Sequence, residues 1–313
     1  MIKFSAPGKI HLLGEHSVVY GKPALIAAVN LRLTVTIQNA KATYIDPTVE
    51  KYGIRKIVES IVKKAFKIKH IPPYKLEISS QLPIGAGLGS SAASSAAYIT
   101  ALLSFLKIKW DLNLINNLAY EAERVFHGNP SGGDNSTVVF GGLIWFRKED
   151  PSLKLIQPLQ LTIPTQLAKN FVLINTGTPK ETTLEMVTLV KNLYKKRPNL
   201  VEKFLTNQES LVRQLLNVIK ECNEKEFIKI IKAGEQNLES IGVVSPLVKP
   251  IIRKIEQAGG AAKICGAGGK TGPTGILLAY HQDKSKLENI AKSFNLSFFS
   301  TALGVEGIDK MYI

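Results

Sequence analysis

Residues 85–91 read Gly-Ala-Gly-Leu-Gly-Ser-Ser, with a glycine at every second position and two serines at the end. An uncharged, alanine-rich stretch then continues to Phe105, which predicts a buried helix that begins at the serines. The first backbone N–H groups of a helix have no partners within it, and the helix dipole adds partial positive charge there. The run therefore predicts a loop that binds an anion such as phosphate. The alternative is a flexible turn capped by serine, but capping alone does not require three glycines.

A second stretch, residues 5–16, reads Ser-Ala-Pro-Gly-Lys-Ile-His-Leu-Leu-Gly-Glu-His. Lys9 within it is a compact cation on a flexible chain, which suits a phosphate or a developing alkoxide. Glu15 and His16 offer a carboxylate and an imidazole side by side. Taken alone these residues are weak evidence, because most single lysines and most Glu-His pairs have no catalytic role.

A third stretch, residues 259–275, is again rich in glycine and contains Gly-Lys-Thr at 269–271. These three residues resemble the end of a Walker A loop, but that pattern needs a glycine five positions before Gly269, where the chain has Ile264. The stretch is therefore either a ligand-binding loop of another kind or a tight turn between two elements.

Three carboxylates lie in or before the segment His-Gly-Asn-Pro-Ser-Gly-Gly-Asp-Asn, residues 127–135. Asp134 follows two glycines, so the chain can hold it close to a ligand, where it would orient a substrate hydroxyl. The alternative is that Asp134 only closes its own turn. Glu121 and Glu123 lie at opposite margins of the apolar face of the preceding helix, and periodicity does not choose between them as the carboxylate that faces a cation.

Composition excludes some classes of protein and leaves others open. The chain has 313 residues and a formal net charge of +15, which would attract RNA, an acidic membrane surface or phosphorylated metabolites. Lysine and arginine are scattered, however, and aromatic residues make up only 7%, without the interleaved aromatic and basic rows typical of RNA-binding proteins. We therefore expect no nucleic-acid partner and keep a basic RNA-binding protein as a remote alternative.

Two cysteines far apart in the sequence suggest neither a disulfide framework nor a zinc site, and the N-terminus lacks the apolar region of a signal peptide. The uncharged stretch 82–105 is long enough to cross a membrane, but it begins with proline and glycine, so we interpret it as a loop leading into a buried helix. These features predict a cytoplasmic protein with no membrane partner.

The hydrophobic pattern predicts a mixed α+β chain with two domains, 1–165 and 166–313, separated where prolines interrupt the pattern. In the first domain, alternation predicts strands after Asn30 and over 75–81, and helical periodicity predicts a helix over 111–127. The apolar run 137–146 favours a further strand with a glycine break. The second half is predicted to form strands at 171–175, 276–279 and 296–300, helices over 182–241 with a break near Pro198, and a helix over 244–258.

Taken together, the three stretches resemble the motifs of the GHMP kinases, the superfamily of galactokinase, homoserine kinase, mevalonate kinase and phosphomevalonate kinase. The likeness runs from Lys3 to about Ala279 and keeps the motifs in order. The phrases at 14–24 and 127–135 resemble the mevalonate kinase branch, whereas galactokinases continue Gly-Glu-His with an Asp-Tyr that is absent here. The resemblance implies a two-domain GHMP kinase fold, with a ribosomal S5 domain 2-like ATP-binding domain and a ferredoxin-like C-terminal domain.

The resemblance also implies a role for each matching residue. Asp134 matches the catalytic aspartate and Lys9 the lysine beside it, while Ser91 and Glu123 match ligands of the Mg²⁺ that accompanies ATP. Glu15 and His16 match positions of the mevalonate pocket, and Thr182 matches a threonine near the reacting hydroxyl. The predicted ATP loop comprises Pro83, Gly85, Ala86, Gly87, Leu88, Gly89, Ser90, Ser91 and Ala92.

This sequence departs from the family pattern at two places. Lys270, Thr271 and Pro273 interrupt a third motif that is usually almost pure glycine and alanine, and Gly133 replaces the branched residue often found before the aspartate. The implied reaction moves the γ-phosphoryl group of ATP to the 5-hydroxyl of mevalonate. Phosphomevalonate or homoserine kinase activity is the alternative, and the resemblance allows a homodimer.

Overall fold

The computed structural model describes residues 1–45, 50, 53–83, 87–127, 130–150 and 153–311. Gly85 and Ala86 of the predicted ATP loop lie outside these described residues. Residues 128 and 129, which precede the turn of Asp134, also lie outside them.

The first sheet is organised around one long strand, β2 (Ala24–Asn39). It pairs antiparallel with β1 (Ile2–Leu13) on one side. On its other side its second half pairs with β4 (Tyr74–Ser80) and its first half with β5 (Leu143–Lys148). Apolar residues alternate along β2 after Asn30 and are buried, so the strands predicted here and over 75–81 are confirmed. Within the described residues seven strands form this sheet, completed by β3 (Tyr44–Ile45), β6 (Lys154–Leu159) and β11 (Asp309–Lys310).

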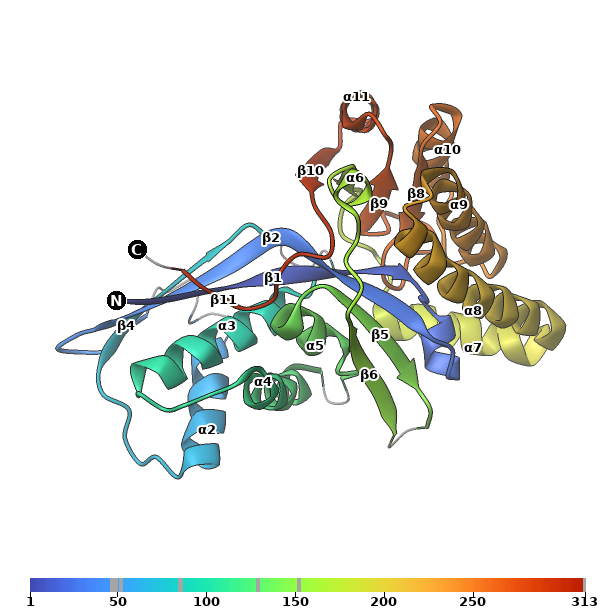
Figure 1. The fold of residues 1–313 in the computed structure, drawn as a ribbon. Helices are drawn as coiled ribbons and strands as arrows, with labels where there is room; N and C mark the ends of the chain where they lie inside the picture. Colours follow the sequence, from blue (N-terminus) through green and yellow to red (C-terminus); the bar gives the residue numbers. More distant parts are fainter. Residues whose placement is uncertain (46–49, 51–52, 84–86, 128–129, 151–152, 312–313) are drawn as a thin grey trace.

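Four helices lie on one face of this sheet (Figure 1). The innermost, α3 (Ser90–Phe105), is buried along most of its length because its small residues allow close packing against β1, β2 and α4. This confirms the predicted buried helix, and no helix among the described residues is both long and apolar enough to cross a membrane. The other three are α2 (Ile54–Phe66), α4 (Leu112–His127) and α5 (Gly133–Phe140).

The strand predicted over 137–146 is wrong in its first half. Residues 137–140 continue helix α5, and the chain becomes extended only at Leu143. Gly141 and Gly142 separate the two elements, with φ of 71° and 64°. The β-branched residues before them favour a strand locally, but packing of α5 against the first sheet, α3 and α4 outweighs that preference.

The second sheet has the antiparallel order β10-β7-β9-β8 in the described part of the chain. In chain order its strands are β7 (Phe171–Asn175), β8 (Ala261–Ile264), β9 (Ile276–Tyr280) and β10 (Ser297–Thr301). Helices separate β7 from β8 and β9 from β10, which gives the β-α-β-β-α-β arrangement of a ferredoxin-like domain, as predicted. Alternate residues of β7 belong to different apolar clusters, so both faces of this sheet are covered.

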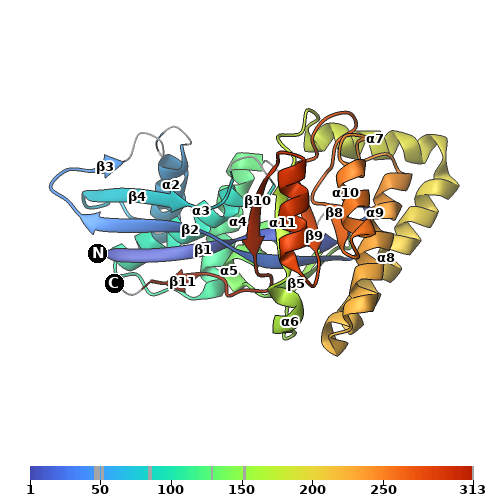
Figure 2. The ribbon, with the colours of Figure 1, turned by 90° about the horizontal axis from the view of Figure 1, so that it is seen from above.

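Most helices of the second half gather at one end of the molecule (Figures 1 and 2). The long pair α8 (Pro198–Glu221) and α9 (Glu224–Ser240) confirms the helical prediction and its break at Pro198. The helix predicted over 244–258 begins later, because Pro246 disfavours helical backbone before it and Pro250 fits the first turn. The other helices are α6 (Thr165–Ala168), α7 (Thr183–Lys196), α10 (Lys249–Gln257) and α11 (Lys284–Ser293).

After β10 the chain returns to the first sheet. Leu303 bridges Val29, and β11 pairs with β1, so the last described residues lie near the N-terminus (Figure 1). The Arg32 guanidinium fixes this return by donating to the carbonyls of Glu306 and Gly307 at 3.0 and 2.5 Å. The division into two domains at residue 165 remains a proposal. The C-terminal segment after β10 belongs to the second half of the sequence but packs on the first sheet.

Candidate active site

A cavity of about 570 Å³ lies where the three glycine-containing stretches meet. Its walls come from the end of β1, the 3-10 turn η1 (Ser17–Tyr20), the first turns of α3, α5 and α7, and the loop after β8. Most of the residues predicted for a site are thus brought together. The polar and glycine lining comprises Lys9, His11, Glu15, His16, Gly87, Gly89, Ser90, Ser91, Asp134, Glu181, Thr183, Gly266, Gly268, Thr274 and Gly275.

Lys9 and Asp134 form an ion pair in this cavity, with 3.0 Å between Nζ and Oδ2. Lys9 lies on β1, where its backbone N–H donates to the Leu88 carbonyl at 2.9 Å. Asp134 lies in the first turn of α5, where the helix dipole favours a negative charge. The lysine side chain is mostly buried, whereas 34% of the aspartate remains exposed. A molecule in the cavity can therefore reach the carboxylate.

The described end of the predicted phosphate loop packs on Lys9. Gly89 precedes α3 with φ of 74°, and a Cβ atom built there would come within 2.7 Å of the Lys9 Cγ. Glycine is required because a side chain would both strain the backbone and displace the lysine. Gly89, the N-cap of α3, has no side chain that could cap the helix, and Ser90 and Ser91 line the cavity. Of the other predicted loop residues, Leu88 and Ala92 bury their side chains and Pro83 is half-buried.

The oxygen donors predicted for Mg²⁺ come from two packed helices. Ser91 begins α3 and lines the cavity, and Glu123 lies on α4 with only 3% of its surface exposed. Glu121 is exposed and pairs with Arg124 at 3.2 Å. A hydroxyl and a buried carboxylate are hard donors of the kind that Mg²⁺ prefers. The chemistry of these donors suits the ion, and of the two glutamates only Glu123 is buried, but it does not stand among the residues that line the cavity. The metal site therefore remains a prediction.

Glu15 joins the first domain to the second sheet. Its Oε1 accepts a hydrogen bond from the Nζ of Lys263, a completely buried lysine on β8. The same ammonium donates to the carbonyls of His11 and Ile264 at 3.3 and 2.7 Å. Burial opposes the charged lysine, but the neighbouring Cys265 and Glu15 outweigh it and raise the pKa of Lys263. Glu15 therefore lines the cavity with its Oε1 already bonded to the Lys263 ammonium, which balances the negative charge of the carboxylate.

A second buried carboxylate, Glu235 of α9, lies close to this ion pair. Burial raises the pKa of Glu235 to about 8, against the opposing effect of the Ile264 N–H that donates to its Oε2 at 2.9 Å. Its other oxygen, Oε1, is buried without a hydrogen-bond partner in the described residues. Sequence reasoning missed both Lys263 and Glu235, because neither stands in a pattern that marks a site.

His16 lines the cavity with a ring that is almost entirely buried. Its Nε2 lies 3.0 Å from the Ala267 carbonyl, and a carbonyl only accepts, so Nε2 carries the proton of this bond. Burial lowers the pKa of His16, although the bond to Ala267 opposes that shift, and the ring is neutral. The second nitrogen of a neutral ring is an acceptor. His16 can thus accept a hydrogen bond from a bound molecule, but its donor is already used.

Thr182, predicted to lie near the reacting hydroxyl, is the N-cap of α7. Its hydroxyl accepts from the Glu185 N–H at 3.3 Å and its own N–H donates to Glu185 Oε2 at 2.7 Å, which forms a capping box. Thr182 stands outside the residues that line the cavity. Its neighbours Glu181 and Thr183 do line it. The predicted role of Thr182 remains a prediction.

The irregular third glycine stretch has a structural role that the sequence could not reveal. The Thr271 hydroxyl donates to Glu181 Oε1 at 3.1 Å. Burial would raise the pKa of Glu181, but the Lys270 N–H and the Thr271 hydroxyl bring it below its usual value. Lys270 and Thr271 therefore fix one wall of the cavity, and the Lys270 side chain is exposed outside the lining.

His11 also lines the cavity, although the sequence analysis did not select it as a site residue. It lies two residues after Lys9 on β1 and faces the same cavity. Its Nδ1 is buried without a hydrogen-bond partner in the described part of the chain. Burial, with Lys9 beside it, lowers the pKa of His11 to about 3, although Asp134 opposes this effect. The alternation of β1 could have revealed it, because side chains two residues apart share a face.

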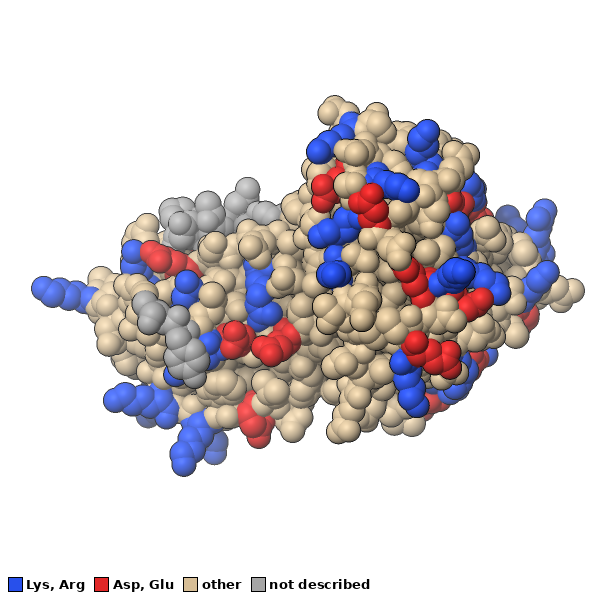
Figure 3. Space-filling view, turned by 45° about the horizontal axis from the view of Figure 1, so that its top comes forward, with Lys and Arg blue, Asp and Glu red and all other residues tan. Residues whose placement is uncertain are grey.

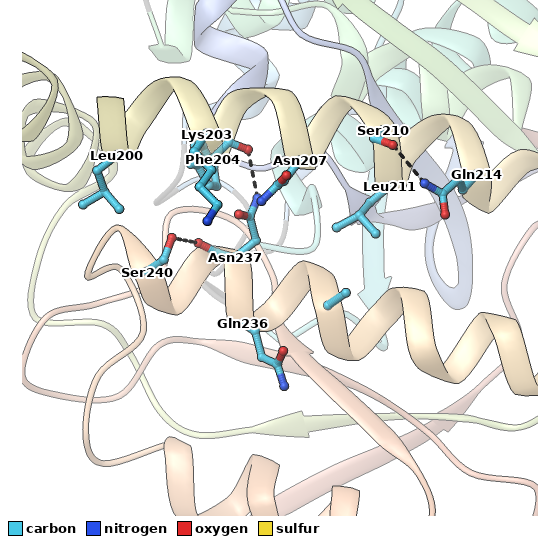
Figure 4. A pocket seen from close by; sticks show the side chains of 11 residues that line it. Leu200, Lys203, Phe204, Asn207, Ser210, Leu211, Gln214, Gln236, Asn237 and Ser240 are labelled. Carbon is cyan, nitrogen blue, oxygen red and sulfur yellow. Dashed lines mark hydrogen bonds between the residues drawn. The ribbon is translucent and has the colours of Figure 1, made fainter. Parts of the chain in front are cut away.

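A separate cavity of about 480 Å³ lies between α8 and α9 (Figure 4). Apart from Lys203, its polar groups are amides and hydroxyls, several of which bond one another or the backbone; Asn237 Nδ2, for example, donates to the Phe204 carbonyl at 2.9 Å. The described lining contains no carboxylate or imidazole. It therefore lacks the groups that phosphoryl transfer needs.

The positive charge of the chain does not gather into one surface patch on the face shown in Figure 3. Lysine and arginine side chains there are dispersed, with aspartate and glutamate among them. This face thus lacks the continuous basic stripe typical of a nucleic-acid interface.

Comparisons with known proteins show which family the chain matches. Residues 54–142 match the family described as GHMP kinases N terminal domain, and residues 218–299 match GHMP kinases C terminal. The chain is 34% identical to the mevalonate kinase of Archaeoglobus fulgidus, over 85% of this chain and 88% of that protein. It is 28% identical to human mevalonate kinase, over 88% and 85% of the two chains.

Solved structures show the same fold. The crystal structure of L. major mevalonate kinase in complex with R-mevalonate superposes with a TM-score of 0.81 at 22% identity, covering 96% of this chain and 95% of that one. The two family matches, the extent of the identity and the shared two-domain fold lead to one assignment. The chain belongs to the GHMP kinase family.

Proposed function

We propose that this protein is an ATP-dependent kinase that transfers the γ-phosphoryl group of ATP to the 5-hydroxyl of mevalonate. Family membership and the extended identity to curated mevalonate kinases support this function. The observation that carries the chemistry is the ion pair of Lys9 and Asp134, 3.0 Å apart and packed against the start of α3.

In the proposed reaction the acceptor hydroxyl lies against Asp134. The carboxylate takes or orients its proton, while the acceptor oxygen forms a bond to the γ-phosphorus and the bond from that phosphorus to ADP breaks. Lys9 stabilises the negative charge that develops on the acceptor oxygen. The N–H groups at the start of α3, with the glycines before it, hold the phosphates of ATP, because the helix dipole places partial positive charge there. Positioning and charge stabilisation are most of what phosphoryl transfer requires.

The proposal includes Mg²⁺, held by Ser91 and Glu123. When bound, the ion neutralises charge on the phosphates and on the leaving group. The protein's part is to aim the Ser91 hydroxyl from the first turn of α3 and to supply the Glu123 carboxylate from α4.

The acceptor pocket in this proposal lies beyond Lys9, toward Glu15 and His16. The neutral His16 would accept a hydrogen bond through Nδ1, and Thr182 remains a candidate on the facing turn. From the sequence we also expect a cytoplasmic protein that binds neither nucleic acid nor membrane. The resemblance also allows a homodimer, and light scattering coupled to size-exclusion chromatography would measure the molar mass that distinguishes a dimer from a monomer.

The deciding experiment is a coupled ADP-release assay with separate acceptors. Mevalonate should support turnover, whereas phosphomevalonate, homoserine and galactose should be very poor acceptors, because a pocket built for one set of polar groups rejects molecules that leave those groups unpaired. Omission of the acceptor measures background ATP hydrolysis. Faster turnover of homoserine or phosphomevalonate would assign the chain to another branch of the family.

A further inference from the structure

His11 is the one histidine of the cavity whose hydrogen-bonding groups are not occupied by the described part of the protein. His16 gives its Nε2 proton to Ala267, but no hydrogen bond joins either ring nitrogen of His11 to the described residues. Of the two ring nitrogens of His11, only Nδ1 is a buried atom without a hydrogen-bond partner. Nε2 is therefore the nitrogen that a molecule in the cavity can reach.

The tautomer of His11 follows from that difference. Burial and the nearby Lys9 keep the ring neutral, so one nitrogen carries a proton and the other does not. An N–H group buried without a partner is rarer in proteins than a buried acceptor without one. The proton is therefore placed on Nε2, which makes His11 a hydrogen-bond donor into the cavity.

The position of His11 separates it from the phosphate loop. Lys9 contacts that loop through the Leu88 carbonyl and Gly89, and β1 then runs on toward Glu15. Two residues of strand place His11 about 6.6 Å further along the same face. That spacing matches the reach from a reacting hydroxyl to an oxygen several bonds away in the same small molecule.

The backbone holds His11 firmly at this point. Its carbonyl accepts from Lys263 at 3.3 Å, and β1 and β2 keep regular pairing from Gly8 to His11, with register shifts just before Gly8 and just after His11. A bulge next to a site commonly re-aims the side chains beside it. The backbone that carries the ring is therefore held in place at this point of the cavity wall.

We infer that His11 is a specificity-determining residue whose Nε2–H donates a hydrogen bond to an oxygen of the acceptor remote from the hydroxyl that is phosphorylated. This inference rests on the proposed function, because it takes the acceptor to lie beyond Lys9 and Asp134. For mevalonate that oxygen belongs to either the carboxylate or the tertiary hydroxyl. Both accept from a neutral imidazole, and the carboxylate gives the stronger, charge-assisted bond.

The test compares His11→Leu, which removes the donor, with His11→Gln, whose amide nitrogen restores a donor near the position of Nε2. His11→Leu should raise the KM for mevalonate roughly 10-fold or more, the loss expected for one hydrogen bond to a polar ligand, while the KM for ATP changes little. His11→Gln should recover part of that loss. Unfolding temperatures of both variants report whether the fold is retained.

His281→Leu is the matched control. His281 is also a buried histidine, but its ring is bonded to Ala258 and to the Asp283 N–H, outside the cavity. This variant should lose stability without any selective change in the KM for mevalonate. If it showed the same selective change as His11→Leu, the His11 effect would be structural and the inference would fail.

Two acceptor analogues identify the oxygen. One is 3-methylpentane-1,3-diol, in which a methyl group replaces the carboxylate, and the other is 5-hydroxy-3-methylpentanoate, which lacks the tertiary hydroxyl. In the wild type, the analogue that lacks the oxygen bound by His11 should have a lower kcat/KM than mevalonate. In His11→Leu the difference in kcat/KM between mevalonate and that analogue should be much smaller, and the other analogue should show no such change. Equal losses in wild type and variant with both analogues would overturn the inference.

The two proposals fail in different ways. A wild-type protein that does not turn over mevalonate contradicts the proposed function. A wild type that does turn it over, together with a His11→Leu variant whose KM for mevalonate is unchanged, contradicts only the role of His11.

Discussion

Lys263, on the second sheet, donates a hydrogen bond to Glu15, which lies two residues after the end of the first strand, and the two side chains are 0% and 2% exposed. The residues are 248 positions apart in the sequence. Their pairing ties the two halves of the molecule together beside the cavity. It also supplies Glu15 with a partner that keeps its charge tolerable in a buried place.

Loss of the lysine should therefore be costly to stability. Lys263→Met leaves Glu15 buried without its cation, and breaking a buried pair in this way typically costs about 3–5 kcal/mol. Urea unfolding measures the change, and Glu15→Gln added to Lys263→Met should restore part of it. Lys229→Met, which removes an exposed lysine paired with Glu226, should change the free energy of unfolding little. Equal effects of the two lysine variants would contradict the importance of the buried pair.

Asp134→Asn tests the chemical step. The amide keeps the shape of the side chain but can neither take a proton nor pair with Lys9, so turnover should fall by about 10²–10⁴. ATP binding, measured by calorimetry, should remain close to that of the wild type because the phosphate loop is untouched. Near-normal turnover at saturating mevalonate would exclude Asp134 from the reaction.

The metal assignment is tested by a matched pair on one helix. Glu123→Gln should raise the Mg²⁺ concentration needed for half-maximal activity, since an amide is a weaker ligand than a carboxylate. Glu121→Gln, whose side chain is exposed and paired with Arg124, should not. A larger Mg²⁺ requirement in Glu121→Gln than in Glu123→Gln would reverse the assignment.

Glu235 should make stability depend on pH. Its pKa is raised from 4.5 to about 8 in the folded chain, so between these values the folded state holds a proton that the unfolded state has released. Its contribution to stability is present below pH 4.5 and is lost as the pH rises toward 8, by up to about 1.4 kcal/mol per pH unit. Glu235→Gln cannot ionise and should flatten this part of the stability curve, measured by urea unfolding across that range. An unchanged slope would contradict the raised pKa.

Gly89→Ala tests the contact between the phosphate loop and Lys9. The new Cβ atom would lie 2.7 Å from the lysine Cγ, so the Nζ should move away from Asp134 and turnover should fall by at least about 10-fold. Gly242 has a similar φ of 76° with no atom within 4 Å of the added Cβ, and Gly242→Ala controls for backbone strain alone. If both variants kept full activity, the packing of Gly89 on Lys9 would not matter for turnover.

The sequence by itself determined the local parts of this protein. Alternating glycines before Ser90, the small residues of α3 and the turn before Asp134 all depend on interactions between near neighbours, which a pattern of residue types records. The same holds for the strands around β2 and the helices α8 and α9. Where the sequence predicted a strand at 137–140 and the chain forms a helix, packing against distant elements outweighed the local preference.

The tertiary structure alone decided how those parts meet. Burial distinguishes Glu123 from Glu121 only because α4 packs on α3, and the His16 donor is occupied only because the loop after β8 reaches it across 251 positions. His11 lies within the motif of residues 5–16. Only the folded chain shows that its ring has no hydrogen-bond partner among the described residues. Such contacts depend on strand order and on the closure of long loops, and neighbouring residues in the sequence carry no record of either.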